Sequence, residues 1–242
     1  MTAAADSSST EAAQAAPLPA HTAVYEVIRR GSSIGEVHVR LSQSESGLWH
    51  FDTETVATSR MARLAGATAE ESAWFAWQGD QVQMLSYRQV TRALGRSRFW
   101  QHQLDWAQNQ SQTQTYQGNY LIELEPGVVD PLTLRLQLAV QLADPSRRGR
   151  DLPFRVLERD EIEDQSFRYL GQESLETPAG CFDAIRMERF RREGSSRNYH
   201  SWHAETFHWM PLRIVQFRDD QEELDIRLIE SSIELVSSCP AN

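Results

Sequence analysis

The stretch from Leu175 to Phe217 decides the fold and reads LETPAGCFDAIRMERFRREGSSRNYHSWHAETFHWMPLRIVQF. Residues 177–180, Thr-Pro-Ala-Gly, favour a tight turn, and Gly-Ser-Ser at 194–196 favours a second one. Apolar and polar residues alternate between these turns, from Cys181 to Arg191, and again after Pro211. A period of two is typical of half-buried strands. The stretch therefore predicts three antiparallel strands joined by turns.

Short alternating runs, separated by turns that often contain glycine, fill most of the remaining chain. Residues 59–66 interrupt the alternation and predict a short helical turn. Before the turn at 177–180, the predicted strands cover 23–30, 34–41, 48–57, 70–77, 81–91, 96–106, 111–116, 119–124, 152–157 and 163–173. After Phe217, one more strand is predicted at 222–236.

One segment has a helical period instead. From Asp130 to Ala143 leucine and other apolar residues recur every four positions in two adjacent stripes, which predicts a largely buried helix. Asp130 is a good N-cap, the proline after it fits the first helical position, and Pro145 ends the segment. One stripe contains Leu132, Leu136 and Val140, and the other contains Leu134, Leu138 and Leu142.

These elements predict a mainly β fold: a large curved antiparallel sheet or incomplete β-barrel of about 11–13 strands, with one mid-chain helix covering its concave face. A sheet of this size commonly forms one domain, to which we assign residues 23–236. Residues 237–242 form a polar C-terminal tail. If the helix closes a cavity, Leu134, Leu138 and Leu142 are the expected ligand contacts.

Composition excludes some functions. The net charge of −10 disfavours nucleic acid as a partner, because phosphate binding needs a basic surface. The sequence contains no window of 18 apolar residues, so we expect no transmembrane segment. All 24 basic residues are arginines, which we attribute to genome composition.

Residues 1–22 form a small, polar segment rich in alanine, serine and proline, which contains too little apolar surface to order itself. Such a segment often follows a removed signal peptide, although a cytoplasmic protein with a ragged start would look the same. Cys181 and Cys239 are compatible with one disulfide but do not require it, and they lack the spacing of a redox pair.

No pattern of catalytic or metal-ligating residues stands out. His200 and His203 are three apart in a predicted strand and would point to opposite faces, so they and His208 predict packing rather than a metal site. No serine lies in a Gly-x-Ser-x-Gly turn, and no glycine-rich phosphate loop is present. We therefore assign no catalytic residue, metal ligand or cofactor.

Seven tryptophans leave two interpretations open. Aromatic side chains supply much of the buried area in β cores, which is the simpler interpretation. Alternatively, some of them line a cavity for an apolar ligand, as side chains do inside larger barrels.

The opening stretch is similar to the DUF3108 family of bacterial proteins. The similarity rests first on the turn Thr-Pro-x-Gly-x-Phe at residues 177–182, followed by Trp202 and Pro211. It also rests on Ile-Gly at residues 34–35 and on Asp-Pro-Leu-Thr at residues 130–133, where the helix begins. At this last position the family more often has Asp-x-Leu-Ser. The similarity covers roughly Ala23 to Ser232. Structural roles fit these residues best. They are Gly35, Asp130, Thr177, Pro178, Gly180, Phe182, Trp202 and Pro211.

The resemblance implies a periplasmic location and a fold similar to the LolA/LolB lipoprotein carriers, which are incomplete barrels with a helical lid over an apolar cavity. It therefore implies a non-enzymatic protein that binds a lipid or other apolar ligand in a helix-lidded half-barrel. Two alternatives stay open: a cell-envelope scaffold or interaction module that binds an envelope protein without a small ligand, and an envelope hydrolase. The family has no established catalytic residues to carry over.

Overall fold

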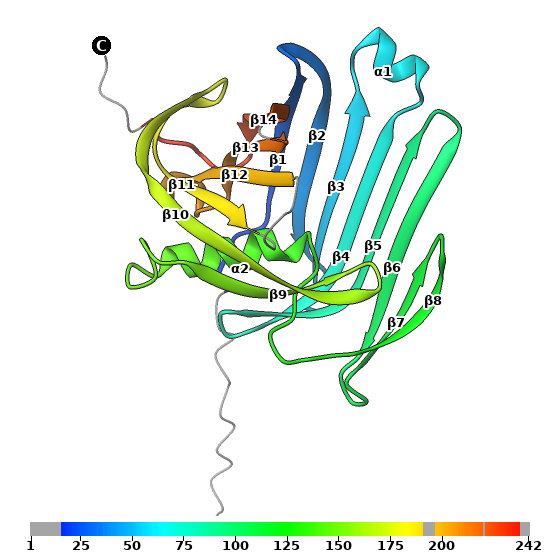
Figure 1. Cartoon of the computed structure of the whole chain (residues 1–242). Coiled ribbons are helices and arrows are strands. Elements are labelled where there is room, and N and C mark those ends of the chain that lie inside the picture. Colours follow the sequence, from blue (N-terminus) through cyan, green and yellow to red (C-terminus); the bar gives the residue numbers. More distant parts are fainter. Residues whose placement is uncertain (1–15, 191–196, 220, 238–242) are drawn as a thin grey trace, which may run out of the picture.

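A computed structural model describes residues 16–190, 197–219 and 221–237. Fourteen strands form one antiparallel sheet whose two edges do not meet (Figure 1). The fold class is therefore as predicted, with one strand more than the upper end of the expected range. The strands of the first half are β1 (His21–Arg29), β2 (Ser32–Gln43), β3 (Trp49–Ala57), β4 (Thr68–Gln78), β5 (Gln81–Ala93), β6 (Arg96–Asp105), β7 (Gln110–Thr115) and β8 (Gly118–Glu123).

The second half contains β9 (Leu152–Glu158), β10 (Glu161–Thr177), β11 (Gly180–Phe190), β12 (Arg197–His203), β13 (Pro211–Arg218) and β14 (Gln221–Ser231). Helix α1 (Arg60–Leu64) connects β3 to β4, α2 (Thr133–Ala143) lies between β8 and β9, and the 3-10 turn η1 (Glu205–Phe207) precedes β13.

The strand order is β8-β7-β6-β5-β4-β3-β2-β1-β14-β13-β12-β11-β10-β9, so each half is a meander. The first and last strands pair with each other, with Ala23 opposite Ser231 and Tyr25 opposite Leu228. The Tyr25 hydroxyl also donates to the carbonyl of Pro211 at 2.8 Å. This seam joins the two halves and leaves β8 and β9 as the edges of the sheet.

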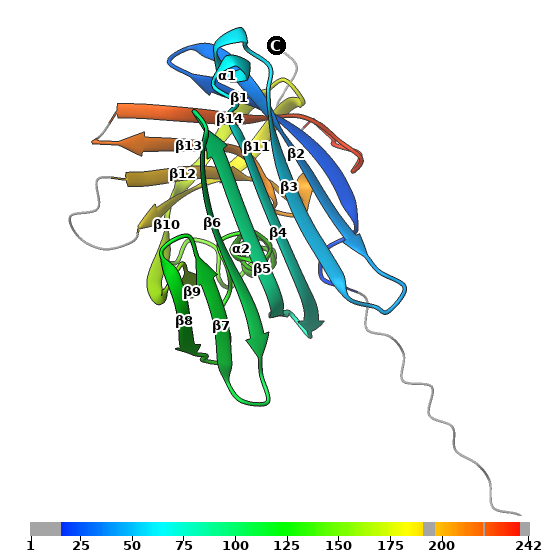
Figure 2. The ribbon, with the colours of Figure 1, turned by 90° about the vertical axis from the view of Figure 1, so that its right-hand side faces the viewer.

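The sheet curves around α2, which lies against β5 and β9 (Figures 1 and 2). One apolar core fills the space between them. From the sheet it takes Phe51, Phe75 and Met84, and from the helix segment Leu132 and Leu136, all of them buried. The structure thus confirms that the helix covers the concave face of the sheet.

The helix begins later than predicted, at Thr133 instead of Asp130. Asp130 still caps it, because its carboxylate accepts from the backbone N–H of Leu132 and of Thr133, each at 2.8 Å. The Thr133 hydroxyl donates to the second carboxylate oxygen at 2.8 Å. Residues 130–132 therefore form a turn that leads into the helix.

At two of the residues that carry the family resemblance, the backbone requires a glycine. A Cβ atom on Gly35 would lie 2.7 Å from the carbonyl oxygen of Val56, so only glycine allows β2 and β3 to approach here. Gly180 has a φ of +139° in the turn after Thr177 and Pro178, a conformation that glycine adopts freely.

The other members of the pattern have structural positions. Phe182 and Trp202 belong to the core, and Pro211 is the first residue of β13. Trp202 lies between two guanidinium groups, those of Arg186 at 5.1 Å and Arg213 at 5.0 Å from its ring centroid.

The folded part begins before the predicted bound, and its last strand is shorter than predicted. Leu18 is buried in the core and β1 begins at His21, so ordered packing starts before residue 23. At the other end, β14 stops at Ser231, earlier than the predicted strand of 222–236, but Ile233 and Leu235 still pack against the core. Cys181 is disulfide-bonded. Cys239, the turn predicted at 194–196 and most of the predicted N-terminal segment lie outside the described residues.

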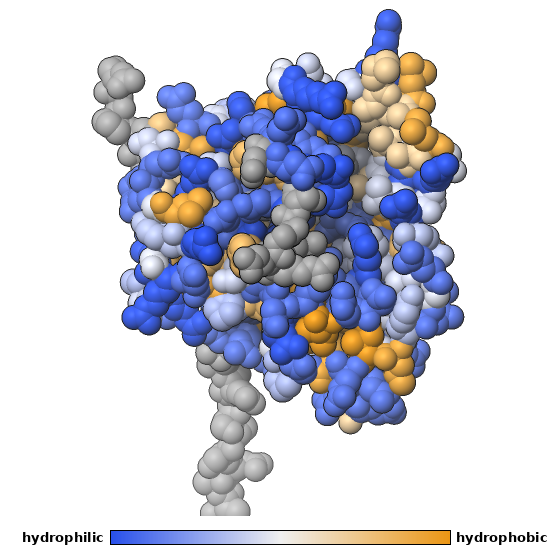
Figure 3. All heavy atoms as spheres, viewed as in Figure 1, coloured by the Kyte–Doolittle hydropathy of each residue, from blue (hydrophilic) through white to orange (hydrophobic). Residues whose placement is uncertain are grey.

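Figure 3 shows that hydrophilic residues cover most of the face seen in Figure 1, and that hydrophobic residues gather at the upper right, over α1. None of the helices formed by the described residues has the length and apolarity needed to cross a bilayer.

Candidate functional site

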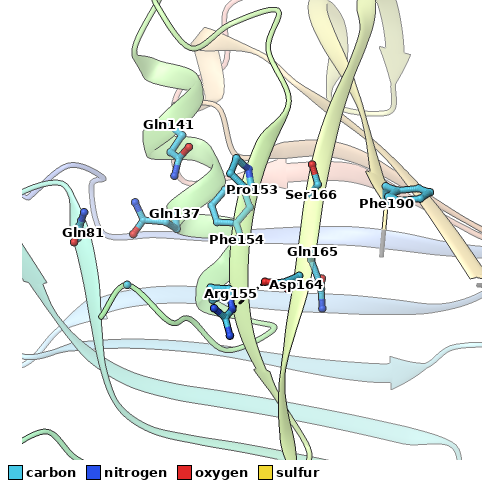
Figure 4. Close-up of a pocket in the computed structure, with 11 residues that line it drawn as sticks. Gln81, Gln137, Gln141, Pro153, Phe154, Arg155, Asp164, Gln165, Ser166 and Phe190 are labelled. Carbon is cyan, nitrogen blue, oxygen red and sulfur yellow. Dashed lines mark ion pairs between the residues drawn. The ribbon is translucent and has the colours of Figure 1, made fainter. Parts of the chain in front are cut away.

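A cavity of about 540 Å³ lies between α2 and the β9–β10 hairpin (Figure 4). Its apolar wall comes from Pro153, Phe154 and Phe190, and its polar wall from side chains of both strands and of the helix. The volume is within the usual range of small-ligand sites. The remaining lining residues are Gln81, Gly127, Gln137, Gln141, Arg155, Asp164, Gln165 and Ser166.

The helix wall of this cavity is held in place by Gln137. Its side-chain carbonyl accepts from the backbone N–H of Val82 at 2.8 Å, and its amide nitrogen donates to the carbonyl of Asp80 at 2.9 Å. Both partners belong to the β4–β5 hairpin, so the buried amide ties α2 to that turn. The helix wall of the cavity is therefore fixed relative to the β4–β5 hairpin.

The one arginine of the cavity wall is paired with two carboxylates. The Arg155 guanidinium lies 2.7 Å from a carboxylate oxygen of Glu125 and 2.9 Å from one of Asp164. Because two carboxylates flank the single arginine, this wall offers no unpaired positive charge to an anionic ligand.

Gln165 places a polar acceptor on the same wall. Its side chain is only 2% exposed, and its amide nitrogen donates to Glu158 at 3.0 Å. That bond fixes the orientation of the amide, and its carbonyl oxygen has no hydrogen-bond partner among the described residues. An unpaired buried acceptor is costly, so an O–H or N–H group of a ligand or a water molecule would stabilise it.

Further polar side chains are buried on the concave face, on strands β5, β6 and β7. Tyr87 and His102 stack with ring centroids 5.8 Å apart, and His102 shares a hydrogen bond of 2.8 Å with the Thr113 hydroxyl. Burial lowers the pKa of His102 to about 4, so this imidazole is neutral at pH 7. The interior of the half-barrel thus combines an apolar core with a polar, uncharged patch.

A second hollow of about 900 Å³ lies across β4–β8. Serine, glutamine and asparagine side chains supply much of its lining, so it suits an apolar ligand less well than the first cavity does. We therefore take the cavity beside α2 as the candidate site.

The three leucines predicted as ligand contacts lie elsewhere on the helix. Leu134, Leu138 and Leu142 are buried in the core, and α2 presents Gln137 and Gln141 to the cavity instead. A ligand would reach the leucines only if α2 moved away from the sheet, so direct contact stays a prediction. The sequence did contain a signal for the two glutamines, since they are four residues apart in a helix otherwise rich in leucine.

The tryptophans mostly pack in the core. Trp49, Trp202 and Trp209 are buried there, and no tryptophan of the described chain lines the cavity beside α2. His203 is also buried, where it bonds the carbonyl of Trp209 at 2.7 Å and the Ser201 hydroxyl at 2.8 Å. Within the described ranges, no three His, Cys, Asp or Glu side chains are grouped so that they could hold a metal ion.

The model of the family described as "Protein of unknown function (DUF3108)" matches residues 24–227. The chain belongs to the DUF3108 family. No curated protein resembles this DUF3108 chain closely enough to count as a relative.

Among solved structures, a β-barrel-like protein of the domain of unknown function DUF1849 from Brucella abortus has a TM-score of 0.58 to this DUF3108 protein at 8% identity, covering 90% of this chain and 98% of that chain. The Pseudomonas aeruginosa MucA/MucB complex has a TM-score of 0.32 at 12% identity, covering 92% and 53%. A protein with a YmcC-like fold from Bacteroides fragilis has a TM-score of 0.34 at 10% identity, covering 88% and 95%. The first likeness shows the fold alone.

Proposed function

We propose that this DUF3108 protein is a non-enzymatic binding protein of the periplasm that holds a lipid or another apolar ligand in the cavity between α2 and the β9–β10 hairpin. The cavity itself carries the proposal. Its size suits a single acyl chain better than a whole diacyl lipid, and Phe154 and Phe190 supply apolar surface for such a chain.

The polar atoms of the wall select among such ligands. The free carbonyl of Gln165 favours a head group with an O–H or N–H donor, and the two carboxylates that pair with Arg155 leave no advantage to an anionic head group. In this proposal Leu134, Leu138 and Leu142 hold α2 against the core, so that the helix acts as the lid.

The disulfide at Cys181 supports the proposed location. Disulfides persist in oxidising compartments such as the bacterial periplasm and are rare in the cytosol. The family to which the chain belongs is also typically exported, as the resemblance in sequence implies.

Filling the cavity tests the proposal. Replacing Gln141 by tryptophan puts a large side chain into the cavity from the helix, and we expect it to weaken binding of the uncharged fluorescent probe N-phenyl-1-naphthylamine about tenfold. Ala143→Trp is the matched control, because Ala143 is exposed on the same helix and does not line the cavity. Titration of the probe's fluorescence gives the three affinities. Equal affinity of wild type, Gln141→Trp and Ala143→Trp would contradict the proposal.

One observation favours a second candidate, an interaction module for an envelope protein. Strand β8 is an edge of the sheet and exposes Tyr120 and Leu121, so an extended segment of a partner could add to it as a further strand. A photo-crosslinking residue placed at Leu121 should then give one discrete adduct in cells. The same residue at Leu64, which is also exposed, should not give that adduct. Identical adduct patterns at both positions would argue against this candidate.

A further inference from the structure

The most exposed hydrophobic side chains gather at one tip of the molecule. Met61 and Leu64 of α1 are 79% and 83% exposed, and Leu94 in the β5–β6 turn is 79% exposed. The backbone N–H of Leu94 donates to the carbonyl of Ala65 at 2.7 Å, which places the turn beside the helix. We call Met61, Leu64 and Leu94 the apolar tip. Figure 3 shows hydrophobic residues gathered there.

The apolar tip does not serve the core. Helix α1 has no buried residue, and all five of its residues belong to the described part of the chain. Its N-cap, Ser59, accepts from the backbone N–H of Ala62, so the helix is formed although it packs nothing inside. Helices of globular proteins are normally stabilised by burying an apolar face, and this one leaves its apolar residues in water.

Leu94 is also in an unfavourable conformation. Its φ is +52°, and the φ of Gly95 is +71°, as in a two-residue hairpin turn that favours asparagine and glycine. A leucine at positive φ destabilises the folded protein, and because the side chain is exposed, its burial offsets little of that cost. The turn does not require a leucine at this position, so the fold does not account for the exposed side chain.

The two chain segments that form the apolar tip have a charge opposite to that of the chain as a whole. Residues 58–69 and 91–104 contain five arginines and neither aspartate nor glutamate, although the net charge of the chain is −10. All five guanidinium groups belong to exposed residues, and that of Arg92 pairs with Glu70 at 2.6 Å. The arginines are Arg60, Arg63, Arg92, Arg96 and Arg98.

Apolar side chains surrounded by basic ones are what the surface of an anionic bilayer recognises. The apolar groups enter the boundary between head groups and acyl chains, while the arginines remain with the lipid phosphates. A protein partner would need an acidic rim around an apolar pocket, and nothing in the fold indicates one.

We propose that the apolar tip docks this protein on an anionic phospholipid membrane. This surface is formed by α1 and the β5–β6 turn, and none of its residues lines the cavity beside α2, so the proposal stands apart from ligand binding. α1 projects beyond the ends of β3 and β4 in both views of the ribbon (Figures 1 and 2).

Sedimentation of the full chain with vesicles tests the proposal. We expect wild type to bind vesicles of phosphatidylglycerol and phosphatidylcholine in equal parts, to bind pure phosphatidylcholine much less, and to dissociate as ionic strength rises. The combined variant Met61→Ser, Leu64→Ser and Leu94→Ser should bind about tenfold more weakly. Leu121→Ser is the matched control, because Leu121 is 65% exposed and lies on β8.

Leu94→Asn separates docking from folding. Asparagine tolerates positive φ, so this variant should melt at the same temperature as wild type or higher, yet bind the vesicles more weakly. The proposal is overturned if wild type does not sediment with the anionic vesicles, or if the tip variants sediment as wild type does. Gln141→Trp should bind vesicles normally and the tip variants should bind the apolar probe normally, so that this proposal and the cavity proposal can fail independently.

Discussion

Replacing Asp225 by alanine is expected to destabilise the protein by about 3–5 kcal/mol, because it leaves two partly buried arginines without their common partner. The carboxylate of Asp225 is 1% exposed. It accepts from Arg213 at 2.8 and 2.9 Å and from Arg227 at 2.8 and 2.6 Å.

The position of these arginines explains the size of the effect. Arg213 of β13 and Arg227 of β14 are opposite one another in the sheet, and like charges in a cross-strand pair repel. Asp225 neutralises both of them. β14 also carries the pairing with β1 that joins the two halves of the sheet, so damage here weakens the seam.

The same interactions make this site sensitive to acid. Burial alone would raise the pKa of Asp225, but the hydrogen bonds and charges of Arg213 and Arg227 together lower the pKa below its usual value. A lowered pKa in the folded state means that the stabilisation is present above about pH 4 and is lost as the pH falls further. Wild type should therefore lose stability below pH 4, and Asp225→Asn should lose less over the same interval.

Urea unfolding followed by circular dichroism at pH 7 measures the change. Glu230→Ala is the control, because Glu230 is an exposed carboxylate on the same strand, and we expect it to change stability by less than about 1 kcal/mol. A similarly small loss for Asp225→Ala would show that the two arginines find other partners or water.

Local patterns predicted the strands of this fold well, because alternation with a period of two depends only on which face of a strand is buried. The pairing of β1 with β14 was not predictable in that way. It joins residues near the two ends of the chain, and the residues at the seam, such as Tyr25 and Leu228, look like those of any other strand. Pairing between distant strands depends on the register of the whole sheet.

The candidate site was less accessible to sequence reasoning. The helix was found from its leucines, and the same leucines were expected to contact the ligand, but a helix with two apolar stripes is mostly enclosed by its own core. Gln137 and Gln141 line the cavity because α2 is rotated to bury those stripes. Phe154 and Phe190 are part of ordinary alternating runs, so nothing in the sequence separates a cavity wall from a packed interior.

Asp130 is expected to make the stability of the protein fall as the pH rises from about 4 to about 6. Burial raises the pKa of this carboxyl to about 6, and the charge of Glu71 adds to the rise, while hydrogen bonds from Thr133 and Leu132 oppose it. A pKa raised in the folded state means that the group's full contribution is present below pH 4 and is lost as the pH passes 6. The loss amounts to about 3 kcal/mol, because one unit of pKa corresponds to about 1.4 kcal/mol.

Asp130→Asn separates this ionisation from the helix cap. The asparagine carbonyl still accepts from the backbone N–H of Leu132 and Thr133 but carries no charge. Between pH 4 and pH 8 wild type should therefore lose about 3 kcal/mol of unfolding free energy that Asp130→Asn keeps. Urea unfolding in matched buffers measures this difference. Asp130→Ala, which also loses the cap, should be less stable than Asp130→Asn by about 2 kcal/mol at every pH. Asp144→Asn at the exposed end of the same helix should lose as much as wild type does over this interval. A difference between wild type and Asp130→Asn that stays constant with pH would contradict the raised pKa, and would mean that the hydrogen bonds from Thr133 and Leu132 fully offset the effect of burial.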